Sequence, residues 1–89
     1  MAALRQGRRM PQYLLNHHHD ANECGVVFAA FAGFESPLRR KCALASCGSG
    51  GHSIWWTVDA ASEENALALL PFFVAERTTA VPVSEVRIP

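Results

Sequence analysis

Four histidines and three cysteines provide side chains of the types that bind transition metals. His17, His18 and His19 are consecutive, and His52 follows a glycine-rich stretch much later in the chain. Because side chains alternate along a strand, His17 and His19 would share one face and His18 would take the other. Two imidazoles on one face, joined by His52 or a cysteine thiolate, would supply three or four metal ligands.

Cys47 is the best placed of the thiols, because it stands beside the glycine loop that leads to His52. We therefore expect a metal site made of His17, His19, Cys47 and His52, with His18 and Cys24 in reserve. Cys24 lies on an apolar helical stripe, which favours a core role, and Cys42 is expected to be structural. Imidazole and thiolate ligands favour Ni, Zn, Cu or Fe, whereas Ca and Mg prefer carboxylate oxygens.

Two other interpretations of the histidines stay open. As an acid/base with a pKa near neutrality, His18 or His52 would move a proton on a small aromatic or unsaturated substrate, as in a cofactor-free isomerase or monooxygenase. That enzyme would need a closed, mostly apolar cavity holding one histidine, with Trp55 or Trp56 as a wall. In a structural or interaction module, the histidines would instead be a solvated strand end.

Composition restricts the class of protein. The chain has 89 residues, 49% of them hydrophobic, and a formal net charge of zero, which suits one folded domain without bulk attraction to nucleic acid. No stretch approaches the roughly 18 apolar residues of a membrane span. No secretory apolar stretch follows the N-terminal arginines, and three cysteines do not suit a disulfide scaffold. We expect a cytoplasmic protein with reduced thiols.

The first nine residues differ from the rest, since they hold Arg5, Arg8 and Arg9 and show no periodicity. We expect residues 1–9 to be a disordered extension, with Met10 as an alternative start, and residues 10–89 to form the single domain.

The first half of that domain predicts a strand, a helix and a hairpin. A strand over 12–19 precedes Asp20, which with Glu23 forms a capping-box pattern at the start of a helix that ends near Gly33. Strand-like runs over 42–47 and 52–59 flank the glycine loop 48–51, which is typical of a hairpin.

The second half predicts a helix and a last strand. Ser62 would cap the helix, and Pro71 would interrupt it. The segment 81–88 alternates apolar and polar residues, with Val81, Val83, Val86 and Ile88 expected to point inward. Pro82 favours an edge position for this strand.

The resulting order is strand, helix, strand, strand, helix, strand. It predicts an α+β fold of ferredoxin-like βαββαβ type, a four-stranded antiparallel sheet with two helices on one face. In this topology the first strand ends, the second ends and the third begins at one edge of the sheet. The histidine triplet, Cys47 and His52 would therefore meet there.

Two helices can cover only one face of such a sheet, yet the third strand has Trp55 on one face and Ile54, Trp56 and Val58 on the other. An exposed apolar face predicts a second copy packed sheet to sheet, that is, a two-fold homodimer.

The element order, the strand with two tryptophans and the turn Leu69-Leu70-Pro71-Phe72-Phe73 resemble the dimeric α+β barrel superfamily. The resemblance covers residues 11–89 and implies a ferredoxin-like fold and a homodimer. Small members of the superfamily include monooxygenases of antibiotic biosynthesis, muconolactone isomerases and metal-binding proteins. Our first expectation is thus a small dimeric protein that binds a transition-metal ion, with a small-molecule ligand as a further partner.

Overall fold

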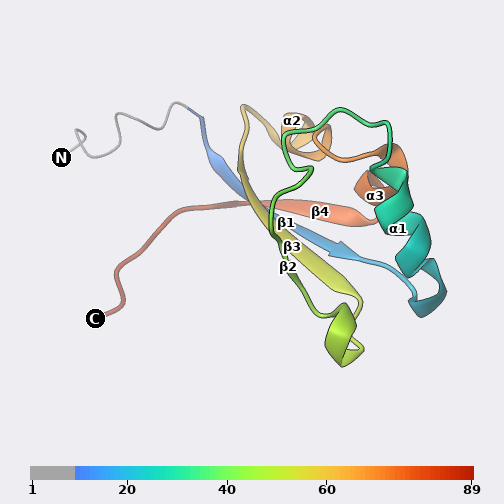
Figure 1. Cartoon of the computed structure of the whole chain (residues 1–89). Helices are drawn as coiled ribbons and strands as arrows, with labels where there is room; N and C mark the ends of the chain where they lie inside the picture. The colour runs from blue at the N-terminus through green and yellow to red at the C-terminus, as the bar shows by residue number, and fades with distance from the viewer. Residues whose placement is uncertain (1–9) are drawn as a thin grey trace.

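The computed structural model describes residues 10–89, and the expected extension 1–9 lies outside them. It is an α+β structure around one four-stranded antiparallel sheet with the order β2-β3-β1-β4 (Figure 1). The strands are β1 (Gln12–His18), β2 (Leu44–Ala45), β3 (Ser53–Asp59) and β4 (Thr78–Val83). The helical segments are the 3-10 turns η2 (Ala21–Glu23) and η3 (Cys47–Ser49) and the helices α1 (Cys24–Ala30), α2 (Glu63–Leu67) and α3 (Phe72–Ala75).

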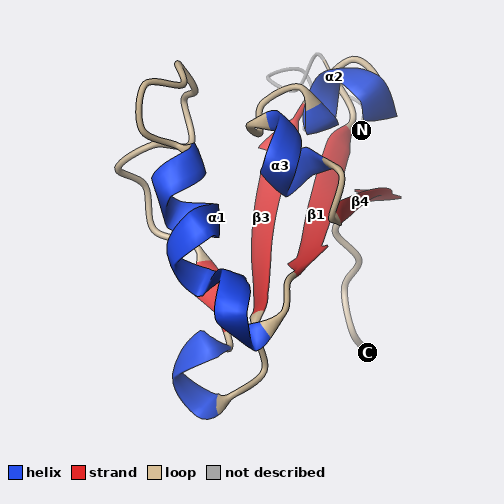
Figure 2. Cartoon of the chain, turned by 90° about the vertical axis from the view of Figure 1, so that its right-hand side faces the viewer, coloured by secondary structure: helices blue, strands red, loops and turns tan. Residues whose placement is uncertain are grey.

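The helices α1, α2 and α3 lie against one face of the sheet (Figure 2). On β1 the side chains alternate, with Leu15 and His17 buried and Asn16 exposed between them. Val27 of α1 and Val74 of α3 have no exposed surface and pack on this same face. His17 and His19 of the histidine triplet are therefore buried in the helix-covered core, whereas His18 is exposed. Across the described part of the chain, no helix has the length and apolar character needed to cross a membrane.

The sequence signals for the helix ends are confirmed. The Glu23 carboxylate accepts a hydrogen bond from the backbone N–H of Asp20 at 3.0 Å, and Gly33 has a positive φ of 78° past the end of α1. Ser62 Oγ accepts from the N–H of Asn65 at 3.1 Å at the start of α2. Pro71 separates α2 from α3, as a residue without an N–H donor should.

The hairpin differs from the expectation at Cys47. The segment 42–47 was expected to be one strand, but β2 holds only Leu44 and Ala45, and Cys47 begins the turn η3. The cause is the Ser46 carbonyl, which accepts from the N–H groups of Ser49 and Gly51 at 3.0 and 2.8 Å. These bonds turn the backbone before Cys47 can pair with β3.

The last strand also differs, since it begins three residues earlier than expected. β4 pairs with β1 from Thr78 opposite His17 to Val83 opposite Gln12, and within residues 10–89 no partner strand continues beyond that point. Ala80, opposite Leu15, is the buried residue of β4. The expected inward positions Val81, Val86 and Ile88 are instead 46%, 76% and 79% exposed. The edge position expected from Pro82 is confirmed.

Candidate metal centre

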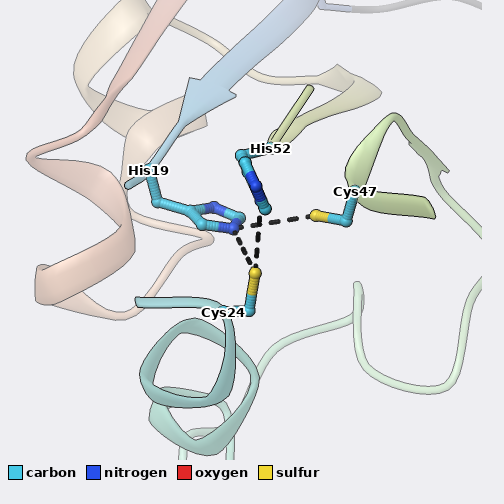
Figure 3. Close-up of side chains that lie close together, drawn as sticks. All are labelled: His19, Cys24, Cys47 and His52. Carbon is cyan, nitrogen blue, oxygen red and sulfur yellow. Dashed lines mark hydrogen bonds between the residues drawn. The ribbon is translucent and has the colours of Figure 1, made fainter. Parts of the chain in front are cut away.

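Four side chains from four separate segments meet where β1 ends and β3 begins (Figure 3). His19 follows β1, Cys24 is the first residue of α1, Cys47 is the first residue of η3, and His52 precedes β3. One ligand atom from each lies within 4.8 Å of the other three. We call these four residues the Cys2His2 group.

The distances inside the group suit tetrahedral coordination. His19 Nε2 lies 3.4 Å from Cys24 Sγ and 3.7 Å from Cys47 Sγ, and His52 Nδ1 lies 3.3 Å from Cys24 Sγ. A tetrahedral zinc ion with its usual bond lengths separates nitrogen and sulfur ligands by about 3.5 Å. The observed separations therefore need little adjustment to receive such an ion.

The hairpin loop positions two of the four ligands through its backbone. His52 is a non-glycine residue with a φ of 54°, in the left-handed region that a side chain with a Cβ seldom adopts. The preceding Gly51 must be glycine, because a Cβ there would overlap the Ser46 side chain. The carbonyl of His52 accepts from the N–H of His19 at 3.1 Å, so the same backbone also holds β1 beside the loop.

The structure brings together three of the four expected ligands, namely His19, Cys47 and His52. Cys24, which was held in reserve and favoured as a core residue, is the fourth member. His17 lies outside the group, with its Nε2 only 3.0 Å from His19 Nδ1. His18 is exposed and its Nδ1 meets Ser53 Oγ at 3.1 Å, away from the group.

A hydrogen-bonded chain behind the group orients the His19 ring. Thr78 Oγ1 donates to the carbonyl of Val74 at 2.7 Å, so its lone pair faces His17 Nδ1 at 3.0 Å. His17 must then carry its proton on Nδ1 and accept at Nε2 from His19 Nδ1. This leaves the lone pair of His19 Nε2 directed at the two sulfurs. Such a partner behind a ligating imidazole is a common feature of metal sites.

Burial sets the charge of these rings. It lowers the pKa of both His17 and His19, and the neighbouring imidazoles lower it further, so both rings are neutral at neutral pH. Burial, followed by the proximity of Cys47, raises the pKa of the Cys24 thiol. In the metal-free state the Cys24 thiol thus stays protonated beside the lone pair of His19 Nε2.

An arginine ties the surrounding segments together. The Arg77 guanidinium lies 3.3 Å from the Glu23 carboxylate and 3.7 Å from the centre of the Phe73 ring. Its backbone carbonyl accepts from the N–H of His18 at 3.1 Å. The start of α1, the end of α3 and the end of β1 are therefore held around the histidines.

Sequence reasoning missed one regularity that pointed to Cys24. His19 precedes Cys24 by five positions, and Cys47 precedes His52 by the same interval. Each pair spans one tight turn, and the sheet then places the two turns side by side.

Two cavities of the described chain border the connector between α1 and β2, away from the Cys2His2 group. Neither is lined by a histidine. They do not support the interpretation in which His18 or His52 acts as a catalytic base inside an apolar pocket. In comparisons with protein-family models, curated proteins and solved structures, none matches this chain.

The buried neutral histidines predict that stability falls with acid. In the folded chain the pKa values of His17 and His19 lie below the ordinary 6.5. As the pH falls below 6.5, these two residues are therefore protonated in the unfolded chain before they are protonated in the folded chain, and the folded state loses stability. Urea unfolding in the presence of a chelator should show a loss of about 2 kcal/mol between pH 7.5 and 5.5.

Glu23 has a lowered pKa, so its protonation would change the free energy of unfolding only at a pH below this window. The variant His17→Gln should lose about half of the pH dependence, because it removes one of the two buried imidazoles with a lowered pKa. A free energy of unfolding that is constant or rises from pH 7.5 to 5.5 would contradict the assignment.

Proposed function

We propose that this protein binds a divalent transition-metal ion, with Zn²⁺ as the preferred ion, through the Cys2His2 group. The observation that supports the proposal is the convergence of four nitrogen and sulfur ligand atoms within 4.8 Å of one another. Tetrahedral sites with two sulfurs and two nitrogens are typical of zinc, and Ni, Cu and Fe are the other ions that suit these ligands. Sites with four protein ligands are structural in most proteins, because they leave no position open for substrate.

A bound ion would add a cross-link between segments that are distant in the sequence. It would link the start of α1 to the hairpin loop and to the end of β1. Ion binding would ionise the thiols of Cys24 and Cys47, so its affinity should weaken as the pH falls. The three cysteines described are free thiols, which suits a reducing compartment such as the cytoplasm.

The three cysteines allow a matched test of the site. Cys24→Ser and Cys47→Ser each remove a ligand and should weaken Zn²⁺ binding by about 100-fold or more. This exceeds the loss of about 10–100-fold that is typical when a residue that only hydrogen-bonds to a ligand is removed. Cys42→Ser, at an exposed position outside the group, should leave affinity unchanged. Competition with a chromophoric chelator gives the affinity. The absorption of the Co²⁺-substituted protein reports sulfur ligation. Equal affinity in the three variants, or no uptake of metal by the unmodified protein, would refute the proposal.

A second test distinguishes a residue that binds the metal from His17, which is hydrogen-bonded to the ligand His19. In His17→Leu the ring of His19 loses its acceptor, so Zn²⁺ affinity should fall by about 10–100-fold while tetrahedral Co²⁺ absorption persists. In His52→Asn, which tolerates the left-handed backbone, the Co²⁺ spectrum itself should change because a ligand is lost. A changed Co²⁺ spectrum in His17→Leu would instead make His17 a direct ligand.

We further propose that the fold is ferredoxin-like and that two copies pack through their open sheet faces. The strand order and the helices on a single face support the first part. The face away from the helices presents Leu14, Trp55 and Val81, and Leu44 beside them is 75% exposed. A face with these apolar side chains suits a second copy of the chain.

A lysine on that face should separate the copies. Val81→Lys should yield a monomer in sedimentation equilibrium at concentrations where the unmodified chain is a dimer, because it would bury an unpaired charge. Val86→Lys, at a position 76% exposed in the C-terminal segment, is the matched control and should stay dimeric. A monomeric unmodified chain would end this part of the proposal without affecting the metal site.

A further inference from the structure

A second candidate site lies along the same side of the sheet as the metal centre. It is a cavity of about 400 Å³ between α1, the connector (residues 32–43) and β3. Its apolar walls include Phe28 and Phe31 at the end of α1 and Ile54 and Trp56 on β3. The Phe31 and Trp56 rings lie 6.3 Å apart, and the Phe28 side chain is still 58% exposed. This volume and this lining are typical of sites for small organic molecules.

The rim of the cavity is basic. Arg39, Arg40 and Lys41 all line it. Within residues 10–89, the carboxylates of Glu23 and Glu76 pair with Arg77 and not with these three cations. Three neighbouring positive charges above an aromatic pocket suit a ligand that carries a negative charge at one end.

The connector is held in place without any ligand. Ser36 Oγ donates to the carbonyl of Leu69 at 2.7 Å and accepts from the N–H of Leu38 at 3.1 Å. The N–H of Lys41 donates to the carbonyl of Leu38 at 3.3 Å. Arg40 has a φ of 64°, and with His52 it makes the two non-glycine residues of the described chain that adopt positive φ. A strained residue in each site is consistent with backbones shaped for binding.

We propose that this cavity binds a small aromatic carboxylate. Its ring would pack against Phe31 and Trp56, and its carboxylate would pair with the guanidinium groups of Arg39 and Arg40. Arginine suits this task because its planar fork pairs with both carboxylate oxygens. A concave pocket of this size admits one ring system, whereas a nucleic acid or a peptide would need a longer groove.

The site shares α1 and β3 with the Cys2His2 group but none of its side chains. Four protein ligands would complete the coordination of the ion, so the carboxylate is not expected to bind the metal. Either proposal can therefore fail while the other holds.

The test uses 2-naphthoate and its uncharged analogue 2-naphthylmethanol as probes of the full chain. In a Trp55→Phe background, Trp56 is the remaining tryptophan, and its fluorescence reports occupation of the cavity. We expect saturable one-to-one binding of naphthoate, at least about tenfold tighter than binding of the alcohol.

Three variants locate the binding. Arg39→Gln with Arg40→Asn, which tolerates the left-handed backbone, should weaken naphthoate binding about tenfold or more and leave the alcohol unaffected. Ala45→Phe should block both probes, because Ala45 lines this cavity. Arg87→Gln, at an exposed position outside the cavity, is the control for loss of a positive charge elsewhere and should leave the affinity for both probes unchanged. No saturable binding, equal affinity for the two probes, or full naphthoate affinity in the Arg39/Arg40 or Ala45→Phe variants would overturn the proposal.

Discussion

The candidate centre depends on a chain of buried hydrogen bonds that begins at the carbonyl of Val74 and ends at the lone pair of His19 Nε2. Each member determines the proton position of the next, because a carbonyl can only accept and a neutral imidazole offers one donor and one acceptor. Breaking one bond would leave a polar group unsatisfied in the core, at a cost of about 1–3 kcal/mol. The positions of Val74 on α3 and Thr78 on β4 beside His17 therefore also orient the metal-binding ring.

The hairpin loop supplies the complementary constraint. Its backbone is turned by the Ser46 carbonyl, by Gly51 in contact with Ser46 and by the left-handed conformation of His52. This irregular path shortens β2 and leaves the Cys47 thiol free to face His19. The loop therefore has less strand pairing and one residue with a strained backbone, and it places two ligands five residues apart in the sequence.

The two proposed sites lie next to each other between α1 and the segment that contains β3. Cys24 begins α1 beside the Cys2His2 group, and one turn later Phe28 lines the apolar cavity. On β3 the chain passes from His52 at the group to Ile54 and Trp56 at the cavity. An ion holding the start of α1 would therefore also fix one wall of the neighbouring pocket.

Local signals in the sequence determined most elements of this fold: the strand with two tryptophans, the Asp20–Glu23 start of α1, the break at Pro71 and the edge strand at Pro82. The expected βαββαβ order of the elements also predicted that His19, Cys47 and His52 would meet at one sheet edge. Only the tertiary structure decided between His17 and Cys24. The alternation of β1 puts His17 and His19 on one face, but α3 and β4 occupy the space around His17 Nδ1. The turn η2 brings Cys24 back toward His19 instead. The register of β4 was decided in the same way, because its partner on β1 ends at Gln12 and no periodicity within 81–88 contains that information.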